Sequence, residues 1–191
     1  MSTLKVDTIL KRTGTGTITV GQSGDTITIP SGATLNAAGT NTLEGINNTP
    51  AFLASMTSNQ TISNNTSTVV ACNNEVLDSN GCYDTSTYKF TPTVAGYYFL
   101  SGSGRFDGTG GDNEYRMHIY KNSSQVSQIM TEWLSQEVQS IVSGLHYANG
   151  SSDFFQFKVQ QSSGSNATFN GGTWESTGEI ARFFGYRILG A

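Results

Sequence analysis

The two histidines, His118 and His146, are the residues of this chain best suited to acid–base chemistry at neutral pH. In many hydrolases such a histidine activates a serine exposed on a Gly-x-Ser-x-Gly turn. The chain has no such segment, and each histidine lies in an alternating stretch typical of a strand, without a nearby nucleophile. We therefore predict that both are surface or interface histidines and that the chain is not an enzyme.

Acidic side chains offer a second chemistry, glycoside hydrolysis, which needs two carboxyl groups roughly 5 to 10 Å apart. Spacing in the sequence cannot show such a pair, and we do not predict depolymerase activity. A glycine-rich loop also lacks the strand-loop-helix context of a phosphate cradle. The carboxylates considered are Glu132, Glu137, Glu175 and Glu179, and the loop glycines are Gly108, Gly110 and Gly111.

Two cysteines, Cys72 and Cys82, flank a turn-rich segment. A hairpin could bring them close enough for a disulfide, but a chain made in a reducing cytosol would keep two buried or half-buried thiols. With two distant histidines they do not form the spacing of a metal site. No metal and no cofactor are predicted.

Two tryptophans are candidates for surface contacts. Trp133 lies in the polar segment 131–136 and Trp174 in the loop 171–178. A tryptophan on a loop can stack on a sugar ring or anchor a protein contact. The alternative is that each closes one end of a barrel or a seam between subunits.

The composition excludes several classes of protein. Of the 191 residues, 13% are charged, against roughly 25% in typical domains. The net charge is −4 and the ten Lys and Arg are scattered, so the chain lacks the basic face that nucleic-acid binding needs. No apolar run approaches the roughly 18 residues of a membrane span. The segment 1–12 has no apolar core, so no secretory signal is expected.

The elements that must position these residues are predicted to be strands. Alternating apolar runs are separated by short turns, and roughly eight to ten of them follow position 51, which indicates an all-β jelly-roll sandwich. We expect a central hairpin over 88–106, because Pro92 and Gly96 bracket a sharp connection. The expected strands are 51–56, 67–72, 88–90, 97–106, 114–121, 125–130, 137–147, 153–160, 167–170 and 180–189, with a polar loop at 57–66 and a turn-rich excursion at 75–83.

The N-terminal part has a different pattern. Residues 1–39 are predicted to form an anchor, with Leu4, Val6 and Ile9 as its apolar points, and a stalk of short strands, 17–20, 26–29 and 33–35. Such strands bury too little to offset a backbone ordering cost of roughly 1 to 2 kcal/mol per residue. We expect three copies to wrap around one axis; the alternative is hairpins folded on the main domain. Residues 40–50 are the expected linker and 51–191 the head.

Four features of the head resemble the trimeric jelly roll of the complement-component-1q globular head, close to the tumour-necrosis-factor fold. The resemblance implies a homotrimer whose aromatic strands pack in the core and around the axis. No carboxylate cluster for calcium is recognisable. The features are NGCYD at 80–84, the YKFTP and AGYYF pair at 88–99, IYKN at 119–122, and the closing TFNG and FGYRIL segments; the aromatic residues assigned to core or trimer packing are Tyr97, Phe99, Phe155, Phe157, Phe184 and Tyr186.

The opening segment 1–39 resembles the start of virion appendage proteins of marine bacteriophages, cyanophages among them. The two resemblances together imply a non-enzymatic virion fibre or knob, assembled in the host cytoplasm, that binds other virion proteins through its N-terminal arm. Its head would contact a glycan or protein of the host surface. A capsid decoration protein is the alternative, and a bacterial carbohydrate-binding or carbohydrate-active module is an alternative of another class.

Overall fold

The computed structural model of the protein describes residues 19–33, 49–107, 113–133, 138–172 and 180–189. The chain divides into two compact units, Met1–Leu43 and Glu44–Ala191. All thirteen elements in the described residues are strands of the second unit. Within the same described residues, no helix is long and apolar enough to cross a membrane.

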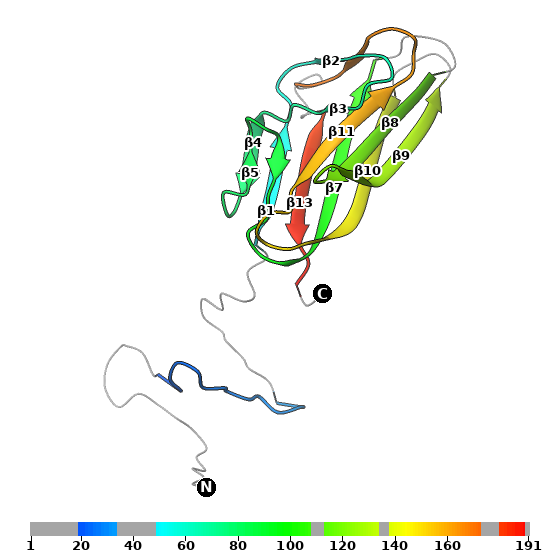
Figure 1. Cartoon of the computed structure of the whole chain (residues 1–191). Helices are drawn as coiled ribbons and strands as arrows, with labels where there is room; N and C mark the ends of the chain where they lie inside the picture. The colour runs from blue at the N-terminus through cyan, green and yellow to red at the C-terminus, as the bar shows by residue number, and fades with distance from the viewer. Residues whose placement is uncertain (1–18, 34–48, 108–112, 134–137, 173–179, 190–191) are drawn as a thin grey trace. The chain divides into compact units, whose positions relative to one another are not determined.

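The strands form two antiparallel sheets that lie face to face (Figure 1). In sheet A, β13 pairs with β1 and β7, β10 pairs with the other edge of β7, and β4 pairs with β1; β12 and β2 extend the sheet. Sheet B has the order β5-β6-β11-β8-β9, with β3 beside β11. This arrangement confirms the all-β jelly roll. The strands are β1 (Ala51–Ser55), β2 (Gln60–Ile62), β3 (Thr68–Val69), β4 (Asn74–Asp78), β5 (Tyr83–Asp84), β6 (Lys89–Phe90), β7 (Gly96–Phe106), β8 (Asn113–Lys121), β9 (Ser124–Trp133), β10 (Val138–Ala148), β11 (Phe155–Gln161), β12 (Ala167–Phe169) and β13 (Arg182–Arg187).

An aromatic core fills the space between the sheets. Side chains alternate along a strand, so every second residue of β7 points inward. Phe52 of β1 stacks on Phe90 of β6, with ring centroids 4.1 Å apart, and meets Phe183 of β13 edge-on at 4.9 Å. Phe106 of β7 packs edge-on against Phe169 of β12 at 4.9 Å. The Phe52–Phe90 pair joins sheet A to sheet B across the core, whereas the other two pairs join strands of sheet A.

Two glycines of β7 admit rings from other strands. A Cβ atom on Gly102 would overlap the Phe157 ring, and one on Gly104 would overlap the Phe169 ring. Both rings are buried, so they have no free space into which to move. Glycine at these positions is therefore a packing requirement.

The predicted hairpin over 88–106 is wrong. β6 belongs to sheet B, where it pairs with β5 and β11, whereas β7 belongs to sheet A. The connection 91–95 therefore crosses from one sheet to the other. Pro92 follows the end of β6 and Gly96 begins β7, so the two residues bracket the connection as predicted, but they do not determine which strand becomes the partner.

Three further strand predictions differ from the structure. β2 lies inside the predicted polar loop 57–66, and β4 begins one residue before the predicted turn-rich excursion 75–83 and otherwise lies within it. The predicted strand 67–72 is reduced to β3. β2 and β3 are short and β4 is an exposed edge strand, so none of them shows the buried alternation on which the prediction relied.

No disulfide joins Cys72 and Cys82, and both are buried thiols. Tyr83 donates its hydroxyl hydrogen to the Cys72 backbone carbonyl oxygen at 2.9 Å, and Cys82 Sγ lies 3.6 Å from Thr93 Oγ1. Of the two alternatives, the thiol pair is the one that the structure contains.

The described part of the N-terminal unit, residues 19–33, contains two turns but no strand. The short strands predicted at 17–20 and 26–29 are therefore absent from the described residues of the single chain. Leu4, Val6 and Ile9 lie outside the described residues, as does most of the segment 33–35. The division between units after Leu43 falls within the expected linker 40–50.

Gly102→Ala should destabilise the head by about 1 to 3 kcal/mol, because the new methyl group overlaps the Phe157 ring in a close-packed core. Urea unfolding at fixed protein concentration measures the change. Ser124→Thr is the control: it also adds a methyl group to a strand, but at an exposed position of β9 in sheet B, and should change stability by less than about 0.5 kcal/mol. Equal losses in the two variants would contradict the packing role of Gly102.

Candidate functional surface

The outer face of sheet A, which points away from sheet B, is apolar. The inward residues of β7 are buried, and its alternate residues Tyr97 and Phe99 therefore lie on the outer side. The strand register places side chains of β10, β13 and β1 beside them. We call this surface the outer aromatic face; it comprises Leu53, Tyr97, Phe99, Ile141, Leu145, Tyr147, Phe184 and Tyr186.

These side chains form rows across the sheet. Tyr186, Phe99 and Leu145 are direct neighbours on β13, β7 and β10. The rings of Phe99 and Tyr186 have centroids 5.5 Å apart, and those of Tyr97 and Tyr147 are 5.6 Å apart. Leu145 and Ile141 keep 58% and 59% of their surface exposed. A contiguous apolar patch of this kind marks an interaction surface.

The structure separates the six aromatic residues assigned to core or trimer packing into two groups. Phe155 and Phe157 of β11 are buried between the sheets. Tyr97, Phe99, Phe184 and Tyr186 belong to the outer aromatic face, where the first and last are exposed and the other two half-buried. Only the second group is available to a partner.

The expectation that no nucleophile lies near the histidines is wrong for His146. Ser127 Oγ of β9 lies 2.9 Å from His146 Nε2 of β10, and Thr131 Oγ1 lies 2.9 Å from Ser140 Oγ on the same two strands. A Cβ atom on Gly144 would overlap Ser127 Oγ. These side-chain bonds join the edge of sheet B to the edge of sheet A.

The Ser127–His146 pair lacks the remaining parts of a catalytic triad. Burial, and secondarily the Lys121 cation, lowers the pKa of His146, so the imidazole is neutral at pH 7 and could accept a proton. In the described part of the chain, however, no hydrogen bond joins His146 to a carboxylate that would orient it. We assign the pair to holding the two sheet edges together.

His118 is buried rather than on the surface, with 2% of its area exposed. It lies on β8 opposite Lys158 of β11, and its ring is 5.9 Å from that of Tyr120. Burial lowers its pKa, the nearby Gln125 side chain opposes this, and the cations of Arg116 and Lys158 reinforce the lowering. His118 is thus a neutral packing residue of sheet B.

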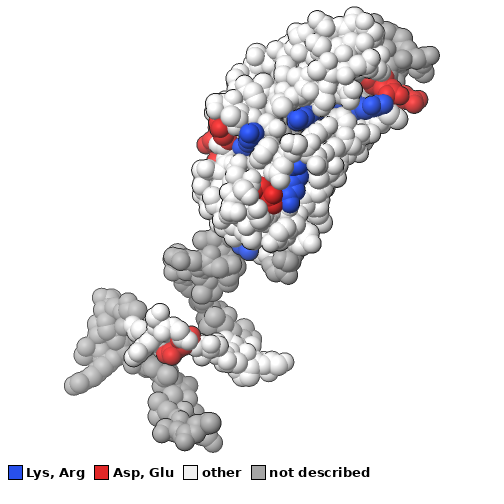
Figure 2. All heavy atoms as spheres, viewed as in Figure 1, with Lys and Arg blue, Asp and Glu red and all other residues white. Residues whose placement is uncertain are grey.

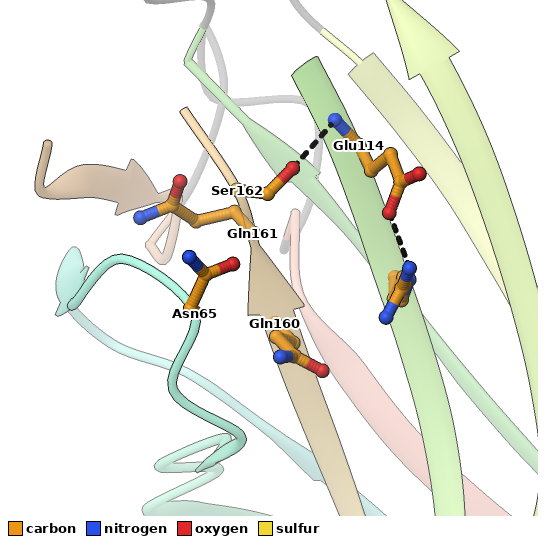
Figure 3. A pocket seen from close by; sticks show the side chains of 6 residues that line it. Asn65, Glu114, Gln160, Gln161 and Ser162 are labelled. Atoms are coloured by element: carbon orange, nitrogen blue, oxygen red, sulfur yellow. Dashed lines mark hydrogen bonds and ion pairs between the residues drawn. The ribbon is translucent and has the colours of Figure 1, made fainter. Parts of the chain in front are cut away.

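A small polar pocket lies where β8 begins and β11 ends (Figure 3). Its volume is about 40 Å³, room for a few waters and far below the roughly 300 Å³ of a ligand pocket. Glu114 pairs with Arg116, and no second carboxylate is among the described residues that line the pocket. The Glu114 backbone N–H donates to Ser162 Oγ at 3.1 Å. The pocket therefore offers no site for a sugar.

Figure 2 shows small, scattered charged groups, several with blue beside red, and no large patch of one sign on this face. Lys121 pairs with Asp153 at 2.9 Å, and Arg116 pairs with Glu114. No three His, Cys, Asp or Glu side chains within the described ranges could hold a metal ion together.

Several residues singled out in the sequence have no described side chain. Trp133 is the last residue of β9, but its side chain and the whole of Trp174 lie outside the described residues. Their roles as surface contacts remain predictions. Glu132 is exposed near the end of β9. The other considered carboxylates and loop glycines, Glu137, Glu175, Glu179, Gly108, Gly110 and Gly111, are outside the described ranges.

Comparison with known proteins gives one family and one fold. The model of the C1q domain family matches residues 51–174. Among solved structures, the globular domain of zebrafish complement 1qA protein is similar to this chain, with a TM-score of 0.50 and 18% sequence identity over 73% of this chain and 97% of that one. At this identity the likeness concerns the fold. No curated protein matches the chain.

Stability should fall as the pH decreases through 6.5, the ordinary histidine pKa, because unfolded histidines bind protons that the folded ones do not. Each histidine contributes a slope of at most about 1.4 kcal/mol per pH unit. Urea unfolding between about pH 8 and pH 5.5 measures it.

The variant His146→Gln should reduce this slope while its amide can still bond Ser127. The double variant His118→Gln, His146→Gln should show almost no slope above the range where carboxylates titrate. An unchanged slope in the double variant would show that neither histidine has a lowered pKa.

Proposed function

Because the C1q domain model covers more than half of its sequence, this protein belongs to the C1q domain family, and we propose that it is a homotrimeric structural protein of a bacteriophage virion. C1q domains typically form homotrimers, and members of the family are generally non-enzymatic. The observation that carries the trimer is the outer aromatic face, which a single chain leaves in contact with water.

The proposed trimer would remove the unfavourable contact of the outer aromatic face with water. Burial of apolar surface contributes about 25 cal/mol per Å², and stable interfaces bury about 800 Å² per partner. A cyclic trimer gives every copy the same covered surface and leaves none open for further growth. Three copies of one chain therefore suit this face better than an open series of contacts.

The virion role is supported by the N-terminal segment, whose sequence resembles that of phage appendage proteins. In this proposal Leu4, Val6 and Ile9 anchor the arm to other virion proteins, and the head is presented to the host surface. A capsid decoration protein would have the same features.

Leu145→Asp should convert the trimer to a monomer, because a carboxylate in an apolar interface loses several kcal/mol of hydration. Sedimentation measures the mass, and circular dichroism checks that the fold is retained. Met130→Asp is the matched control, since Met130 is also exposed but lies on β9 of sheet B. A parent chain that sediments as a monomer at micromolar concentration would rule out the trimer.

Purified virions should contain the protein, and its copy number distinguishes the two virion roles. A few trimers per particle indicate a tail fibre or knob, whereas hundreds indicate capsid decoration. Quantitative mass spectrometry against the major capsid protein measures this ratio. Absence from particles, together with glycan binding or sugar release by an isolated monomer, would favour a bacterial carbohydrate module instead.

A further inference from the structure

Two turns in the N-terminal unit have the same geometry. Asp25 N–H donates to the Gln22 carbonyl and Ala33 N–H to the Pro30 carbonyl, each at 3.0 Å. The third residue of each turn is a glycine with positive φ, 94° at Gly24 and 85° at Gly32. The serines before these glycines do not have positive φ, so both are type II turns.

Glycine is required at positions 24 and 32 because of the positive φ angle and not because neighbouring atoms leave too little space for a side chain. A Cβ atom added to Gly24 or Gly32 would meet nothing within 4 Å. An L-residue in the left-handed region costs about 1 to 2 kcal/mol. The Ser-Gly pairs at 23–24 and 31–32, eight residues apart, therefore repeat the same turn conformation as well as the same sequence.

Type II turns are poor hairpin turns. Hairpins favour types I′ and II′, whose twist matches that of the flanking strands, whereas types I and II splay the strands apart. Accordingly, no residue of 19–33 pairs in a strand within the chain. The two turns are corners that redirect the chain without pairing its flanks, which disfavours the hairpin alternative for this segment.

The residues between the corners favour a strand that lacks a partner. Thr26, Ile27, Thr28 and Ile29 are all β-branched, and β-branched residues suit strands. In an extended chain Ile27 and Ile29 share one side and the threonines share the other. Val20, Ile27 and Ile29 are all exposed in the single chain. Both the backbone and one apolar side of this segment are thus open to another strand.

Copies of the same chain are the partner that fits. The only charged residue in 19–33 is Asp25, and its carboxylate accepts a hydrogen bond from Gln22 N–H at 2.7 Å. Identical segments therefore meet without appreciable charge repulsion. A trimer of heads also tethers three such segments near one another, which raises their effective concentration.

We propose that residues 26–29 pair with the same residues of the other two copies, with Gly24 and Gly32 as corners and Val20, Ile27 and Ile29 buried on a shared axis. This interface rests on the trimer of the proposed function but is separate from the outer aromatic face. It would make the N-terminal unit an interchain stalk.

Cysteine cross-linking of the full chain tests the interface. Ile27→Cys should form a covalent dimer on oxidation, because a disulfide needs Cβ atoms about 3.5 to 4.5 Å apart and side chains on the shared axis meet at that distance. Thr28→Cys, on the opposite side, should give several-fold less dimer. The parent chain provides the baseline, since Cys72 and Cys82 are buried.

A second pair of variants tests the corners in the Ile27→Cys chain. Gly24→Ala with Gly32→Ala should lower the dimer yield several-fold, whereas Ser23→Ala with Ser31→Ala should leave it unchanged. A chain that sediments as a trimer but cross-links equally at 27 and 28 overturns the stalk and leaves the head trimer standing. A monomer by sedimentation overturns the head trimer and, with it, this inference.

Discussion

The contact of the Phe157 and Phe169 rings with the bare backbone of β7 is the interaction on which the head depends. Gly102 lets the Phe157 ring of sheet B lie against the strand, so the two sheets approach closely, and Gly104 admits the Phe169 ring of β12 within sheet A. With every second position of β7 facing inward, Tyr97 and Phe99 face outward. One strand thus provides both the core and the surface for which we propose a trimer contact.

The sequence predicted the fold class because alternation is local: a strand with one buried face shows it regardless of its partners. Pairing is not local, which is why the hairpin over 88–106 was wrong although its bounds were nearly right. Local alternation also could not show which aromatic residues are buried in the core and which lie on the outer face. Phe157 and Tyr186 both alternate with polar neighbours, and only the position of a second sheet decides which of them is buried.

The Ser127–His146 contact could not be predicted either, since the residues are 19 positions apart on strands of different sheets. In the N-terminal unit the sequence showed a repeat and its apolar positions. It did not show the turn type, which is the observation that separates corners from hairpins. The surface-contact roles of Trp133 and Trp174 remain predictions that rest on residue type alone.

The position of β13 affects how the protein is made. It is the last of the described strands, yet it lies between β1 and β7, and it supplies Phe183 to one side of the sheet and Phe184 and Tyr186 to the other. During synthesis, sheet A therefore cannot be completed until β13 has left the ribosome, because β13 fills the position between β1 and β7. A chain cut short before this strand lacks the middle of sheet A, together with Phe184 and Tyr186 of the outer aromatic face, so an incomplete product could not form the trimer contact that we propose.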